Sequence, residues 1–328
     1  MLSRIAENMY WIGRYVERAE CTARLLNVNY LALAEAPLTP GARGIVTEQW
    51  GPLLSITDNE AVFRSHYERA DAASVSTWLA TDRANSGSVA SSLAFARENA
   101  RTLRDRISTE MWEALNRTYL SLCVEQEGAL DEDALYDFCV NARDASYLFF
   151  GIADATLPRD QGWYFIRLGQ YLERADNTIR TLQVRYRRNG DEETEKTSAP
   201  AATAGVTAGV DAHRSMALLK SLSAFEAFRK RYHSQLEPAL MAEFLLLDPN
   251  FPRSLRFCAR VAHEILTELQ NRNADSGAAE RLAGRLSAQL EYLDAAARIT
   301  EDEAPSLDDL LKTLAAVSDA VTQTYFRA

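Results

Sequence analysis

Two separate stretches of the sequence carry the same spacing of residues that could bind charged groups. Residues 13–24 read Gly-Arg-Tyr-Val-Glu-Arg-Ala-Glu-Cys-Thr-Ala-Arg, and residues 169–180 read Gly-Gln-Tyr-Leu-Glu-Arg-Ala-Asp-Asn-Thr-Ile-Arg. On an α-helix, positions i, i+4, i+7 and i+11 lie along one stripe. In each stretch the glycine, both carboxylates and the last arginine therefore share a stripe. The repeat predicts two helices that present the same polar face.

The chemistry open to this face is the recognition of charged groups. The guanidinium groups of Arg18 and Arg174 can hold a phosphate or a carboxylate through paired hydrogen bonds. Glu17 and Glu173 would then orient these arginines or recognise an amine. A structural role is the alternative, in which each glutamate pairs with the Glu-Arg arginine of the other copy across a pseudo-twofold axis. The two roles do not exclude each other.

A glycine opens both copies of the repeat. Glycine inside a helix costs about 0.5–1 kcal/mol relative to alanine. Gly13 and Gly169 therefore indicate that a neighbouring helix or a ligand lies close to the stripe.

Other arrangements that could do chemistry have less support. Glu17, Glu20, Glu173 and Asp176 could hold Mg²⁺ as a set of carboxylates, but the neighbouring arginines would neutralise them, and we expect no metal site. The four histidines are isolated, and none follows a glutamate by three positions as in di-iron bundles. The sequence lacks the phosphate-binding motifs GxGxxG and GxxxxGK[ST], and it lacks the nucleophile motif GxSxG. No catalytic residue is assigned.

The elements that would position these residues are helices throughout. Apolar residues recur at helical spacing along nearly the whole chain, and no period-two run indicates a strand. We predict an all-α bundle with two long motif-bearing helices at about 2–35 and 160–188, related by an internal pseudo-repeat. Further helices are predicted at about 45–57, 59–82 (with Asp58 as a cap), 88–107, 108–127, 131–153, 211–235, 238–247, 253–272, 275–298 and 306–326. Residues 1–328 form one domain in this prediction, with a mobile low-complexity linker at about 189–210.

The composition narrows the class of protein. The chain has 328 residues, 47% of them hydrophobic, and a formal net charge of −10. An acidic chain of this kind is not expected to bind nucleic acid or an anionic membrane. Its four cysteines are far apart and are expected to be free buried thiols. The N-terminus carries charges too early for a signal peptide, and we expect a cytoplasmic protein.

The doubled Glu-Arg motif in an acidic helical chain of this length resembles the bacterial alpha-E family. Two further blocks fit that family, one running from Arg97-Glu98-Asn99-Ala100-Arg101 to Asn116 and the other being residues 248–257, Asp-Pro-Asn-Phe-Pro-Arg-Ser-Leu-Arg-Phe. The resemblance covers nearly the whole chain and leaves out the stretch at 189–210.

The resemblance implies partners and a biochemical setting. Members of this family are encoded beside, or fused to, circularly permuted ATP-grasp proteins, often with a transglutaminase-like protease. The resemblance therefore implies that this chain is a component of a peptide- or amide-forming system. In such a system ATP and Mg²⁺ belong to the ATP-grasp partner, and this chain is expected to bind no cofactor of its own. If the chain is enzymatic, it would be an accessory subunit of that ligase. The alternative is a non-catalytic helical scaffold whose Glu-Arg pairs are a device of core packing.

The candidate residues for substrate or partner binding come from both motif copies and from a third helix. Under the family resemblance, the helix carrying the block at 97–116 would supply a third wall of the polar site, although a solvated face with Arg101–Asp105 pairing also explains its charges. The candidates are Tyr15, Glu17, Arg18, Arg24, Asn99, Arg101, Tyr171, Glu173, Arg174 and Arg180.

Overall fold

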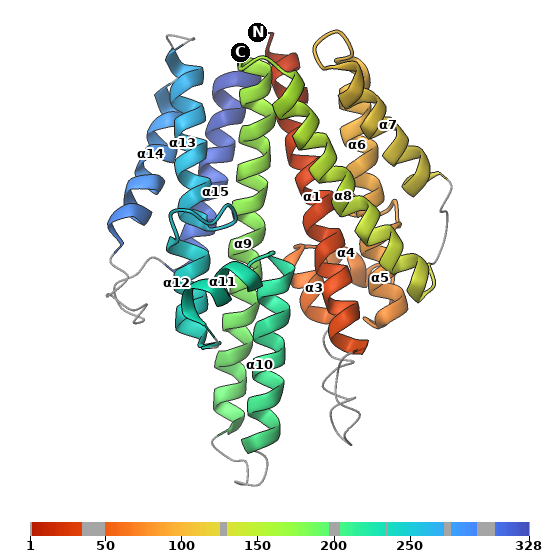
Figure 1. The fold of residues 1–328 in the computed structure, drawn as a ribbon, viewed down its shortest axis with the longest axis vertical. Coiled ribbons are helices and arrows are strands. Elements are labelled where there is room, and N and C mark those ends of the chain that lie inside the picture. The colour runs from red at the N-terminus through yellow and green to blue at the C-terminus, as the bar shows by residue number, and fades with distance from the viewer. Residues whose placement is uncertain are drawn as a thin grey trace.

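The computed structural model describes residues 2–34, 50–124, 130–196, 204–233, 235–271, 277–293 and 306–327. Within these ranges the protein is all-α and contains no strand, as predicted (Figure 1). The helices are α1 (Ser3–Ala34), α3 (Gly51–Ile56), α4 (Glu60–Arg64), α5 (Ala72–Ala80), α6 (Val89–Thr102), α7 (Thr109–Cys123), α8 (Glu132–Thr156), α9 (Gln161–Lys196), α10 (Ala204–Ser221), α11 (Phe225–Tyr232), α12 (Pro238–Leu247), α13 (Leu255–Asn271), α14 (Gly277–Tyr292) and α15 (Leu307–Val321), which continues as a π-helical turn, η2 (Thr322–Phe326).

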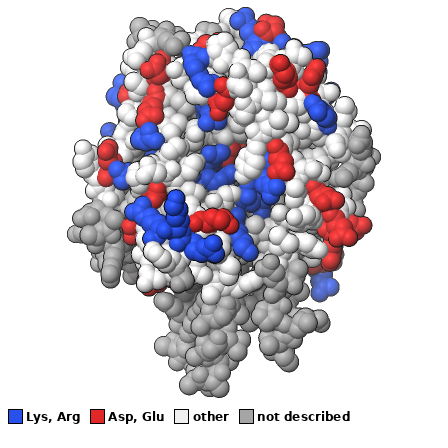
Figure 2. Space-filling view, viewed as in Figure 1, with Lys and Arg blue, Asp and Glu red and all other residues white. Residues whose placement is uncertain are grey.

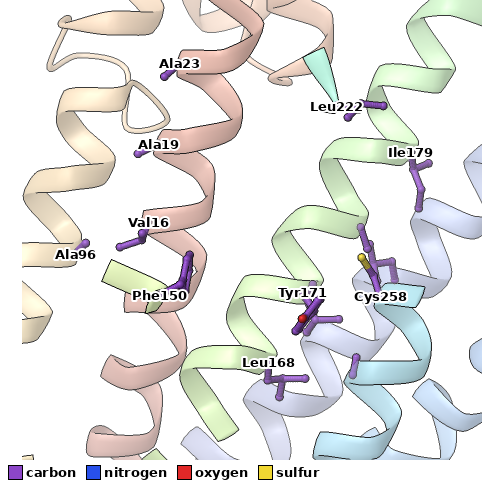
Figure 3. Packing of buried hydrophobic residues seen from close by; sticks show 14 of the residues in the cluster. Val16, Ala19, Ala23, Ala96, Phe150, Leu168, Tyr171, Ile179, Leu222 and Cys258 are labelled. Atoms are coloured by element: carbon purple, nitrogen blue, oxygen red, sulfur yellow. The ribbon is translucent and has the colours of Figure 1, made fainter. Parts of the chain in front are cut away.

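The two motif helices, α1 and α9, lie side by side at the centre of the molecule (Figure 1). Helix α1 also packs against α6 and α8, whereas α9 packs against α13 and α15. The apolar faces explain this division (Figure 3): Val16, Ala19 and Ala23 of α1 point toward α6, while Leu168 and Ile179 of α9 lie on the side of the C-terminal helices. The Glu-Arg faces are therefore left for the contact between α1 and α9.

Glycine allows this contact to be close. A Cβ atom built on Gly13 would lie 2.0 Å from the carbonyl oxygen of Ile166, and one on Gly169 would lie 2.1 Å from the carbonyl oxygen of Tyr10. Real Cβ atoms do not approach backbone oxygens so closely, because the atoms would overlap. The neighbour indicated by the two glycines is therefore the other motif helix.

Short polar side chains begin several of these helices. The side chains of Ser88, Ser108, Asp131 and Ser306 each accept a hydrogen bond from a backbone amide in the first turn of the following helix. Such caps satisfy amides that have no partner within the helix. They set the starts of α6, α7, α8 and α15 close to the predicted positions.

Three predicted boundaries were wrong. The helix predicted at 59–82 is two helices, because Asp71 and Ser74 form a capping box that starts α5 anew. The helix predicted at 211–235 is broken after α10 by Ser223, whose φ is 51°. Helix α9 runs to Lys196 and α10 begins at Ala204, both inside the predicted linker at 189–210; residues 197–203 of that stretch lie outside the described residues.

None of the helices in the described ranges combines the length and the apolar character that crossing a membrane requires.

Candidate binding site between the two motif helices

The first group of charges at the α1–α9 contact centres on Glu173. Arg18 holds it through two bonds, from Nε to Oε1 at 2.5 Å and from Nη2 to Oε2 at 3.0 Å, and Arg14 donates to Oε2 as well. Only 8% of the Glu173 side chain is exposed. Burial alone would raise the pKa of this carboxyl, but the two guanidinium groups hold it at about 2. Glu173 is therefore a fixed anion at neutral pH.

The second group centres on Glu17, on the opposite side of the contact. Arg174 donates from Nε to Oε1 at 2.6 Å and from Nη2 to Oε2 at 2.9 Å, and Gln170 adds a bond of 3.1 Å. The Glu17 side chain is almost completely buried. The reciprocal pairing of each glutamate with the arginine of the other motif, expected from the sequence, is therefore confirmed. Figure 2 shows basic side chains gathered in the hollow between α1 and α9 on the face in view.

A residue from outside the two motifs completes this second group. Arg253 lies in the segment before α13 and donates from Nη2 to Oε2 of Glu20 at 2.9 Å, while its Nη1 lies 3.4 Å from Oε1 of Glu17. Arg24 contacts Glu20 as well. Burial would raise the pKa of Glu20, but Arg253 and Arg24 lower it to about 2. Glu17, Glu20 and Cys21 lie close enough together for a metal ion, but a buried guanidinium already contacts both carboxylates. Arg253 therefore adds a third positive charge to this cluster, beside those of Arg24 and Arg174.

A polar cavity of about 290 Å³ lies beside the first group. Helices α1 and α9 form one wall, and the turns at residues 57–59 and 86–87 form the other. Its charged lining comprises Arg14, Arg18, Arg180, Asp58, Glu173 and Asp176. Since a cavity of roughly 10–15 Å³ already admits one water molecule, this space is large enough for a small ligand.

The acidic side of the cavity is held by Arg180. Its Nε donates to Oδ2 of Asp176 at 2.7 Å, and its Nη1 lies 3.0 Å from Oδ2 of Asp58. Burial, together with the nearby Glu173 carboxylate, raises the pKa of Asp176. Asp58 has a φ of 56°, a conformation that non-glycine residues adopt rarely. It does not cap α4, as the sequence had suggested, but turns its carboxylate to Arg180.

Two polar atoms of this cavity have no partner among the described residues. Nδ2 of Asn177 is buried and makes no hydrogen bond within the described part of the chain. Arg18 uses only Nε and Nη2 on Glu173, which leaves Nη1 without a hydrogen bond to the described residues. A buried donor such as Nδ2 of Asn177 normally has an acceptor, whereas the Arg18 side chain is 28% exposed. The cavity thus offers unpaired hydrogen-bond donors to a polar ligand.

Eight of the ten predicted site residues fall into three sets. Arg18, Glu173 and Arg180 line the cavity, whereas Glu17, Arg24 and Arg174 belong to the group around Arg253. Tyr15 and Tyr171 flank the ion pairs, with the Arg18 guanidinium carbon 5.7 Å from the Tyr15 ring centroid and that of Arg174 5.4 Å from Tyr171.

Asn99 and Arg101 do not join the site. Arg101 is exposed and pairs with Glu98 on the same helix, and the residues that line the cavity include none from the block at 97–116. The solvated-face alternative for this block is correct for Arg101, with Glu98 rather than Asp105 as the partner. The wall assigned to that helix is instead formed by residues 57–59 and 86–87.

The structure also brings into the site residues that the sequence did not predict. Arg14 lies within the first motif, but it corresponds to Gln170 and so fell outside the shared pattern. Arg253 lies in the family-like block at 248–257, which was the available signal. Nothing in the local sequence marks Gly87 or Asn177 as cavity residues.

The comparisons with known proteins agree with this architecture. Residues 1–326 match the model of the Alpha-E family, described as a predicted alpha-helical domain with a conserved ER motif. Uncharacterized proteins of Mycobacterium bovis and of two strains of Mycobacterium tuberculosis are each 25% identical to the chain over 300 residues. The match covers 88% of this chain and 32% of each relative, so the chain spans about a third of the length of the curated relatives it matches. No solved structure matches the chain. With the family model spanning almost every residue, the chain belongs to the Alpha-E family.

Proposed function

We propose that this chain is the binding component of a peptide- or amide-forming system and works with an ATP-grasp ligase. The polar cavity beside Glu173 is its binding site. The ligase supplies ATP and Mg²⁺ chemistry, and this chain holds an amino-acid-like substrate or a polar segment of the partner.

The observation that carries the proposal is the pairing of opposite charges around one cavity. Arg14 and Arg18 on one side suit a carboxylate or phosphate, and Asp176 and Asp58 on the other suit an ammonium or a guanidinium. A ligand with both charges, such as an amino acid, matches this lining. The length of the relatives, of which the chain matches about a third, supports a role beside further protein domains.

The test is reconstitution of the chain with the ATP-grasp ligase that we propose as its partner. ATP turnover and product mass are measured with mixtures of amino acids, for each protein alone and for both together. We expect product only when both are present. Full product formation by the ATP-grasp protein alone would refute the proposal.

A matched pair of variants ties the activity to the cavity. Arg18→Lys and Arg174→Lys each keep the charge but lose the paired bonds to one glutamate, and only Arg18 lines the cavity. We expect Arg18→Lys to reduce product formation about tenfold or more, with a smaller loss for Arg174→Lys. If both variants lose product formation equally, and in proportion to their loss of thermal stability, both ion pairs have a packing role.

The second candidate function is a scaffold without a small-molecule site. It is favoured by the glycine-mediated contact of α1 with α9 and by the deep burial of Glu17. A binding protein gains stability with its ligand by RT ln(1 + [L]/Kd). A scaffold would show no such gain with any small polar ligand.

A further inference from the structure

The segments that precede α6 and α13 are built alike. Asp82 and Asp248 each accept, through Oδ1, the amide of the residue two positions later, at 2.9 and 2.8 Å. Six positions after each aspartate stands a serine, Ser88 or Ser254, whose Oγ accepts the amide three residues further on, at 3.1 Å in both cases. The serine amide in turn donates to the carbonyl three residues before it, at 3.1 Å from Ser88 and 3.0 Å from Ser254.

This likeness places Gly87 and Arg253 at the same position, directly before the serine. Arg253 extends its guanidinium to the motif of α1, where it meets Glu17, Glu20 and the sulfur of Cys21, the last at 3.7 Å. Gly87 has no side chain to extend to the motif of α9.

The corresponding groups of α9 face the cavity that Gly87 leaves. In the motif repeat, Glu17, Glu20 and Cys21 correspond to Glu173, Asp176 and Asn177. All three line the cavity, and so does Gly87. The cavity thus lies where a counterpart of the Arg253 side chain would lie.

The charges agree with a missing cation. Around Arg253, the two glutamates are already balanced by Arg24 and Arg174, so Arg253 adds one net positive charge. In the cavity, three carboxylates are balanced by three guanidinium groups. Oδ1 of Asp176 accepts no hydrogen bond from any described residue, since Arg180 binds Oδ2. A cation in the cavity would give both sides of the contact the same charge.

We propose that the cavity beside Gly87 binds a guanidinium group, which takes the place that Arg253 occupies on the other side. The group donates to Asp176 and lies against Glu173 and Asn177. A free ligand or an arginine of a partner chain can carry it, and the chemistry of recognition is the same. The inference rests on the proposed function in using the same cavity, and it names the class of ligand.

The test measures binding to the whole chain by calorimetry and by thermal denaturation. The probes are agmatine, L-arginine and L-citrulline, which has nearly the same shape as arginine but ends in a neutral ureido group in place of the guanidinium. A capped tripeptide with a central arginine represents a partner chain. We expect agmatine to bind about tenfold or more tighter than citrulline. A tripeptide that binds tighter than agmatine assigns the group to a partner protein, and the reverse order assigns it to a small ligand.

Two variants locate the binding. Gly87→Arg supplies the guanidinium from within the chain and should abolish agmatine binding. Gly87→Ala is the matched control and should retain it, because its Cβ meets only the side-chain ends of Asn59 at 3.0 Å and Asn85 at 3.3 Å. Asp176→Asn should weaken agmatine binding about tenfold or more, and it keeps the test decisive if Gly87→Arg does not fold.

Failure of this inference differs from failure of the proposed function. If citrulline binds as tightly as agmatine, or if no guanidinium compound binds, the inference is overturned. Product formation that still requires Arg18 would then leave the proposed function in place. If agmatine binds but ligation needs no part of this chain, the inference holds and the proposed function fails.

Discussion

Replacement of Glu173 by glutamine tests whether the charges at the α1–α9 contact hold the two helices together. The variant keeps the shape of the side chain but leaves Arg14 and Arg18 without their shared anion. Their side chains are 13% and 28% exposed. Removing one partner of a buried ion pair typically costs about 3–5 kcal/mol. We expect a loss of this size in the free energy of unfolding at pH 7.

The pKa of Glu173 gives a second estimate of the same quantity. Its value falls from 4.5 to about 2 on folding, which corresponds to about 3 kcal/mol of stability. Because the folded pKa is the lower one, this stability is present above pH 4.5 and is lost as the pH falls toward 2. Glu20 contributes with the same sign over the same range. The free energy of unfolding falls with pH because of these two carboxylates, and Glu173→Gln should therefore remove about half of that fall.

The assay is urea denaturation of the wild type and the variant at pH 7, 5 and 3. The two free energies of unfolding should differ most at pH 7 and converge at low pH. Glu98→Gln is the control, because Glu98 is half exposed in its pair with Arg101 and should contribute less than about 1 kcal/mol. A difference between wild type and Glu173→Gln that does not change with pH would refute the electrostatic argument.

Two further predictions concern the same contact. Gly13→Ala should destabilise the fold by about 3 kcal/mol or more, because the added Cβ overlaps a backbone oxygen of α9. Gly151→Ala on α8 is the control: its Cβ meets no atom within 4 Å, and it should stabilise the fold by about 0.5–1 kcal/mol. Thermal denaturation of both variants checks this, and equal effects would contradict the close packing of α1 against α9. Arg253→Ala should lower the melting temperature by removing the guanidinium that contacts both Glu17 and Glu20, and methylguanidine at millimolar concentration should raise the melting temperature of the variant more than that of the wild type. An unchanged melting temperature in Arg253→Ala, or rescue equal to the wild-type response, would contradict the role assigned to that guanidinium.

The helices, the polar face and the family could be read from the sequence. Periodicity and caps are local properties, since a helix bonds its own backbone and only its side-chain pattern selects the buried face. The repeated Gly, Glu and Arg positions therefore predicted two helices with matching polar faces. Their complementary charges gave the pairing of Glu17 with Arg174 and of Glu173 with Arg18 as one of two alternatives, and the structure has these pairs. Where local signals competed, as between 59 and 82, the boundaries were wrong.

The cavity and its composition were decided by the tertiary structure alone. Arg253 and Gly87 acquire their opposite roles only when two similar turns are placed beside two different motif helices, far away in the chain. By its local sequence, Asp58 could cap a helix. In the structure its carboxylate instead pairs with Arg180, a residue more than a hundred positions away in the chain. Long-range packing determines which polar groups line one cavity, and the local pattern of a sequence does not specify that cavity. The sequence thus determined the two helices and the charged residues of the Glu-Arg contact. The fold determined that Arg253 fills one side of this contact and that the side at Gly87 holds a cavity.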